Sequence, residues 1–149
     1  MHIAWHPIIV HLPVALVVVC VIFDCGRWVF GREQLLRAGF WGGSTPYLIF
    51  AFVSAINAMA TGLKAEDQLA VKTESITALV EAHETVAFIV LGLLAILTFW
   101  RIALRGQFPA RGGFVYLVLL IALGAAVGFG AHLGGQLVFS NGAGVGIQF

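Results

Sequence analysis

Histidine is the residue of this sequence whose type and placement could do chemistry. Of the five histidines, four lie at the edges of apolar stretches: His6, His11, His83 and His132. An ionisable side chain at the end of an apolar membrane segment is costly and is treated first as a functional candidate. Neutral imidazole is a common ligand of haem iron and of metal ions such as zinc and copper. We therefore expect these histidines to bind a haem or a metal ion.

The stretches that carry the histidines predict a membrane protein. The chain is 60% hydrophobic and only 10% charged, whereas soluble domains are about 25% charged. Four apolar runs have roughly the 20 residues that a spanning helix needs, and none shows the alternation of a barrel strand. No clustered basic face is present, which excludes nucleic acid as a partner. We expect an all-α, integral membrane four-helix bundle, one domain over residues 1–149, with spans at 8–30, 40–62, 85–104 and 113–133.

The arginines predict how the bundle is oriented. The first and third connections carry three arginines each, whereas the second connection mixes lysines with carboxylates. By the positive-inside rule, the two arginine-rich connections are cytoplasmic. Both termini and the second connection then face the periplasm of a bacterial inner (cytoplasmic) membrane. Because Lys64–Glu81 is polar and rich in helix formers, a short helix on the outer surface is expected between the second and third spans.

Three histidines from different spans lie at one predicted depth. With a rise of about 1.5 Å per residue, His11 lies about 24 Å along its helix from Arg27. On the same basis His83 lies about 27 Å from Arg101, and His132 about 27 to 31 Å from the start of its span. The three histidines should therefore form one layer near the outer edge of the hydrocarbon.

Other residues complete the predicted site. His6 lies just outside the layer, and Glu81 and Glu84 are near enough to His83 in the sequence to orient an imidazole. Asn57, near the outer end of the second span, either forms an interhelical hydrogen bond or contacts the ligand. The face of His132 is nearly free of side-chain bulk and would suit a flat porphyrin or close helix packing; its small residues are Gly124, Ala125 and Gly128.

Haem b is the favoured cofactor, and two alternatives stay open. The apolar, glycine-lined surface favours haem, since a bare ion would be better served by more carboxylates. The first choice of axial pair is His83 with His132, while His11 and His6 would hold a second haem or contact propionates, so one haem or two are expected. In the first alternative, His11, His83 and His132 bind a Zn or Cu ion directly. In the second, the histidines are hydrogen-bonded in a cofactor-free structural or assembly subunit.

The motifs together resemble a known family. The chain looks like an uncharacterised family of bacterial four-helix membrane proteins, a domain of unknown function whose members resemble membrane b-type cytochromes and occur within larger redox proteins. The resemblance covers nearly the whole chain and rests on the patterns HPIIVHLP, Thr61-Gly62, the His83 opening of the third span, and HLGGQLVF. Where the family pattern has a further histidine before the final glycines, this sequence has Asn141.

These observations predict a redox role. We expect a haem b electron-transfer protein, or a subunit of a membrane redox complex, with its haem near the periplasmic face. Its expected partners are the lipid bilayer, other subunits of the complex or a periplasmic electron carrier, and a quinol. No side chain has the arrangement of a nucleophile with an orienting base, so the isolated chain is not expected to catalyse a reaction.

Overall fold

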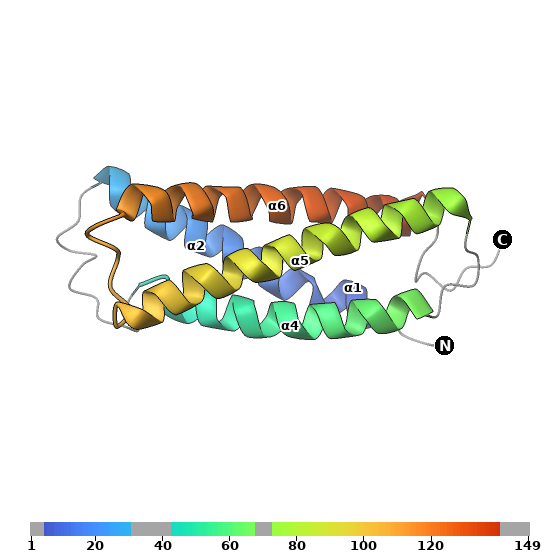
Figure 1. The fold of residues 1–149 in the computed structure, drawn as a ribbon, viewed down its shortest axis with the longest axis horizontal. Helices are drawn as coiled ribbons and strands as arrows, with labels where there is room; N and C mark the ends of the chain where they lie inside the picture. Colours follow the sequence, from blue (N-terminus) through green and yellow to red (C-terminus); the bar gives the residue numbers. More distant parts are fainter. Residues whose placement is uncertain (1–4, 31–42, 68–72, 141–149) are drawn as a thin grey trace.

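The structure is a computed structural model that describes residues 5–30, 43–67 and 73–140. These residues form helices α1 (Trp5–Ile9), α2 (His11–Phe30), α4 (Thr45–Asp67), α5 (Glu74–Ala103) and α6 (Gly113–Phe139). Four long helical segments, with α1 and α2 counted as one, are apolar enough to cross a membrane. The helices lie along one common direction (Figure 1). The expected all-α membrane four-helix bundle is therefore confirmed.

The helices pack as an up-and-down bundle. In sequence order the long helices alternate in direction, α5 packs against α6, and α4 packs against both α2 and α5 (Figure 1). Contacts between α2 and α6 close the bundle, and the short α1 rests on α4. One end, which we call the histidine end, carries His6, His11, His83 and His132. The opposite end, which we call the arginine end, carries Arg27, Arg101, Arg105 and Arg111.

The first span is interrupted at Val10, between α1 and α2. Pro13 has no N–H to donate to the carbonyl of Ile9, and its ring crowds the preceding turn. The next helical hydrogen bond, from Val14 N to Val10 O, is long at 3.5 Å. Because of this interruption, His6 belongs to α1 and His11 to α2. The angle between their side chains therefore cannot be calculated from the regular rotation of one helix.

The short surface helix expected over Lys64–Glu81 is wrong for the described part of that segment. Residues 64–67 are the last turn of α4, and residues 74–81 are the first turns of α5, which continues without a break to Ala103. Thr73 caps α5, because its Oγ1 accepts a hydrogen bond from Ile76 N. No glycine or proline follows until Gly92, so nothing stops the helix between Glu81 and Thr85.

The interior is narrow and the outer surface is apolar. Leucines of α5 and α6 with Val17 and Leu48 form the core. Large apolar side chains on every long helix face outward, among them Val29, Phe50, Phe88 and Phe114. Exposed apolar surface of this extent would be unstable in water and is matched by lipid tails. The chain is thus an integral membrane protein in contact with the bilayer.

Candidate functional site

His6 is a half-buried histidine at the start of the bundle. Its Nδ1 lies 3.0 Å from the carbonyl oxygen of Ala58 and 3.2 Å from Thr61 Oγ1, both on α4. A carbonyl can only accept, so Nδ1 carries the proton and donates, which leaves Nε2 with a free lone pair. Metal-ligating histidines are held in this way, by a hydrogen bond from the nitrogen that does not ligate.

Gly62 makes room for the His6 ring. A Cβ at position 62 would lie 2.9 Å from His6 Cε1, which is closer than van der Waals contact allows. The absence of a side chain therefore lets the imidazole lie directly against α4.

His83 is the second half-buried histidine, on α5. Its Nδ1 is buried near the backbone of Gly130 on α6 and forms no hydrogen bond of normal geometry there. Its ring lies against α6, where a Cβ at Gly134 would be 3.2 Å from Cε1. The two imidazoles, His6 and His83, interact electrostatically. Because Nδ1 lies against the α6 backbone, Nε2 is the ring nitrogen through which His83 could bind a ligand.

His11 and His132 are exposed. His11 Nδ1 donates to the carbonyl oxygen of Pro7, one turn earlier. His132 Nε2 lies 3.1 Å from Nε2 of Gln136 on the same helix. The structure therefore brings His6 and His83 to the interior and leaves the other two histidines at the surface that faces lipid or headgroups.

The small residues beside His132 do not line an interior slot. Ala125 and Gly128 are exposed, and a Cβ at Gly128 would meet nothing within 4 Å. A Cβ at Gly124 would lie 3.3 Å from Val21 Cγ2 on α2, and one at Gly130 would lie 3.2 Å from Val86 Cγ1 on α5. Gly124 and Gly130 thus serve close helix packing, the role that small residues have in many membrane bundles.

Asn57 lies away from the two interior histidines. Its Nδ2 donates to Val53 O on its own helix at 2.9 Å. It lines an open, mostly apolar groove of about 430 Å³ between α2 and α4, together with Leu12, Leu16, Tyr47, Phe50, Val53 and Ser54. Thr61, one turn further along α4, is the polar residue that contacts a histidine.

The described residues at the histidine end offer few grouped metal-binding side chains. Within the described residues, no three His, Cys, Asp or Glu side chains are grouped so that they could hold a metal ion. Glu84, which the sequence suggested as a partner of His83, lies near two other carboxyl groups, those of Glu66 and Glu81. Zinc and copper sites need three or four protein ligands, whereas haem iron needs at most two. Asn141 lies outside the described residues.

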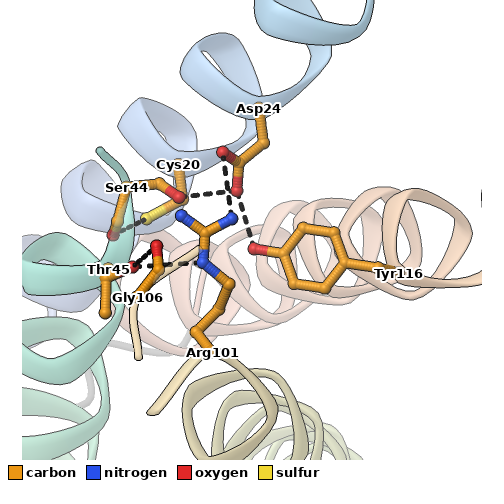
Figure 2. Close-up of polar contacts among 7 residues, drawn as sticks. All are labelled: Cys20, Asp24, Ser44, Thr45, Arg101, Gly106 and Tyr116. Atoms are coloured by element: carbon orange, nitrogen blue, oxygen red, sulfur yellow. Dashed lines mark hydrogen bonds and ion pairs between the residues drawn. The ribbon is translucent and has the colours of Figure 1, made fainter. Parts of the chain in front are cut away.

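A second polar cluster lies in the interior at the arginine end (Figure 2). Asp24 of α2 is 1% exposed. Its Oδ2 accepts hydrogen bonds of 2.6 Å from Ser44 Oγ and from Tyr116 Oη, and its Oδ1 lies 3.7 Å from Arg101 Nη1. These contacts join α2, the start of α4, α5 and α6 around one carboxylate.

Thr45 connects this cluster to the last turn of α5. Its hydroxyl accepts from Arg101 Nε at 3.1 Å and donates to the carbonyl oxygen of Gly106 at 3.0 Å. Cys20 Sγ donates to the carbonyl oxygen of Ser44 at 3.7 Å. The guanidinium of Arg101 also faces the rings of Phe108 and Tyr116. We call Cys20, Asp24, Ser44, Thr45, Arg101, Gly106 and Tyr116 the buried polar cluster.

The sequence analysis did not single out this cluster, although one signal was present. Asp24 is the only carboxylate among the apolar residues 8–30, and an ionisable residue inside a span is a functional candidate by default. Arg101 was assigned to a cytoplasmic connection, whereas it lies within α5 and is 0% exposed. Tyr116 and Ser44 have no sequence feature that predicts their contact with Asp24.

Comparison with known proteins identifies a family. A family model described as a predicted membrane protein (DUF2231) matches residues 2–146. The chain therefore belongs to this family, which confirms the expected membership of an uncharacterised membrane protein family. The description gives no reaction, ligand or partner. Comparison with curated proteins and with solved structures gives no match.

Proposed function

We propose that this member of the DUF2231 family binds haem b at the histidine end and passes single electrons within a membrane redox complex. His6 and His83 would be the axial ligands. The observation that carries the proposal is the placement of these two rings. His6 Nδ1 is held by Ala58 and Thr61, and His83 Nδ1 is buried against α6 near Gly130, so each ring would have Nε2 left for a ligand.

The choice of this pair follows from the directions of the side chains. The sequence favours His83 with His132, but His132 is exposed and interacts with Gln136. His6 and His83 are both half-buried, and they are close enough that a positive charge on one ring would repel one on the other. Placing the pair between α1 and α5 would also let residues of α4 and α6 support the two rings.

The protein's own groups would do three things at this site. The Ala58 carbonyl oxygen would keep the proton on His6 Nδ1 and orient the ring. Because Gly62 and Gly134 have no side chain, the His6 ring would lie directly against α4 and the His83 ring directly against α6. The surrounding helices would exclude water and so tune the potential. The haem would supply reversible uptake of one electron.

The orientation belongs to the same proposal. The arginine-rich connections would be cytoplasmic by the positive-inside rule, so the histidine end would face the periplasm of a bacterial inner membrane. The haem would then exchange electrons with a quinol, another subunit or a periplasmic carrier.

An absorption spectrum of protein purified from its native membrane tests the proposal. We expect a Soret band and sharp α and β bands on reduction, with protohaem identified by pyridine haemochrome. His6→Ala and His83→Ala should each abolish the low-spin spectrum, while the matched variants His11→Ala and His132→Ala should retain it. Wild-type protein without a Soret band overturns the proposal, and stoichiometric zinc or copper in that sample would establish direct metal binding instead.

A further inference from the structure

Arg101 has hydrogen-bonding capacity that the described structure does not use. Its side chain is 0% exposed, and only Nε makes a hydrogen bond, to Thr45 Oγ1. Nη1 and Nη2 have no hydrogen-bond partner. The distance of 3.7 Å from Nη1 to Asp24 Oδ1 is an ion pair and is too long for a hydrogen bond.

This situation is costly inside a membrane protein. A buried charged donor without an acceptor loses hydration, and the ion pair with Asp24 replaces that hydration on the Nη1 side only. Asp24 Oδ2 already accepts from Ser44 and Tyr116. Asp24 Oδ1 faces Nη1, which leaves Nη2 as the nitrogen with no acceptor nearby among the described residues. An oxygen of a group from outside the chain would give Nη2 the acceptor that it lacks.

The N-terminus of α4 lies at the same place. Arg101 Nε contacts Thr45, the first residue of α4, and Nη2 lies beside Gly43, two residues earlier. The first N–H groups of a helix have no partner within the helix and carry partial positive charge. In α4 these groups belong to Thr45 and Tyr47, because Pro46 has no N–H. Gly43 provides space as well, because a Cβ there would lie 3.3 Å from Nη2. The guanidinium and the helix end therefore present positive charge to one position.

We propose that Arg101 and the N-terminus of α4 bind a phosphate-type oxyanion on the Gly43 side of the guanidinium. The guanidinium fork matches two oxygens of a phosphate, and helix N-termini are ready sites for this anion. Asp24 faces Nη1 and balances part of the charge, so the anion would meet Nη2 first. The phosphate could belong to the headgroup of an anionic phospholipid or be inorganic phosphate.

The position at the arginine end fits either source. Arg105 and Arg111 are exposed near this end, and basic residues at a membrane surface attract anionic headgroups. Those two side chains provide general attraction, whereas Arg101 would provide a specific contact. The proposed anion site lies at the opposite end of the bundle from His6 and His83, so it is independent of the haem proposal.

The experiment uses the full chain in nanodiscs of phosphatidylcholine. In one arm phosphatidylglycerol is added to the lipid mixture, and in the other inorganic phosphate is added to the buffer; binding is measured as the rise in thermal stability of the protein. We compare the wild type with Arg101→Lys, which removes the planar fork, with Gly43→Ala, which puts a methyl group beside Nη2, and with Arg111→Lys as the matched exposed control.

We expect half-saturation to need about tenfold more anion in Arg101→Lys and in Gly43→Ala, the loss of roughly one charge-assisted hydrogen bond. Arg111→Lys should match the wild type. Stabilisation by phosphatidylglycerol alone assigns the site to a lipid headgroup, and stabilisation by inorganic phosphate assigns it to the free anion. If Arg101→Lys does not fold, the anion affinity of Gly43→Ala tests the proposal, because this variant keeps the ion pair of Arg101 with Asp24. The proposal is overturned if neither anion stabilises the wild type, or if Arg111→Lys weakens binding as much as Gly43→Ala does.

Discussion

Tyr116 donates a hydrogen bond of 2.6 Å to Oδ2 of Asp24, and this contact joins α6 to α2 inside the bundle (Figure 2). Tyr116 is 0% exposed. In a bilayer no water replaces a lost interior hydrogen bond. The contact is therefore expected to contribute more than an ordinary surface hydrogen bond.

Tyr116→Phe should destabilise the folded protein by about 1.5 to 3 kcal/mol, the usual contribution of a hydrogen bond to a charged group. The ring and its packing against Phe108 and Trp100 are retained, so the change reports the hydroxyl. The free energy of unfolding in detergent is the measurement. Tyr47→Phe is the control, because the Tyr47 side chain is partly exposed at 37%. Equal stability of the two variants would show that the hydrogen bond to Asp24 contributes nothing.

The pair of Asp24 and Arg101 should behave as one unit. Asp24→Leu leaves the Arg101 charge buried without a counterion, and we expect a loss of about 3 to 5 kcal/mol. Arg101→Met alone leaves the Asp24 carboxylate with its hydrogen bonds from Ser44 and Tyr116 but without a counterion, and should cost a similar amount. The double variant removes both charges, so its loss should be clearly smaller than the sum of the two. Additive losses in the double-mutant cycle would contradict this coupling.

The fold could be read from the sequence because each span is a long apolar run of the right length. The start of α5 was misplaced because the polar segment Lys64–Glu81 suggested a separate element, whereas a capped helix without glycine or proline continues. Polar residues at the start of a long helix can therefore be part of a spanning helix that extends beyond the hydrocarbon, as in α5.

The common depth of the three histidines stays a prediction from the sequence, and the directions of their side chains could not be predicted from it. Rise per residue gives depth along a helix, but the face that His132 presents depends on how α6 is rotated against α5. The break at Val10 adds a second uncertainty, because His6 and His11 belong to separate helices. The placement of His6 against Ala58 and Thr61 is a tertiary contact that no spacing in the sequence encodes.

Gly134 and Gly135 form a matched pair for testing the contact between His83 and α6. Alanine at position 135 meets nothing within 4 Å, whereas alanine at 134 would approach His83 Cε1 to 3.2 Å. Each substitution gains about 1 kcal/mol of helix propensity. We expect Gly135→Ala to raise the free energy of unfolding, and Gly134→Ala to gain less because the His83 ring must shift. In haem-loaded protein, Gly134→Ala alone should move the midpoint potential. Indistinguishable variants in both measurements would show that the contact has no influence.

Thr61 should affect ligand binding through His6. Thr61 Oγ1 lies 3.2 Å from His6 Nδ1 and donates to Ala58 O at 3.0 Å, the same carbonyl that accepts from the histidine. Thr61→Val removes this hydroxyl with little change of shape, so the His6 ring is less firmly oriented. Loss of such a supporting contact typically weakens a metal site by about 10- to 100-fold, and we expect about tenfold because Ala58 O remains. The rate of haem transfer to an apoprotein acceptor measures this change. Thr85→Val is the control, because Thr85 Oγ1 is exposed and donates only to Glu81 O on its own helix. If both variants release haem at the wild-type rate, His6 is not held through Thr61, and Ala58 O alone orients the ring.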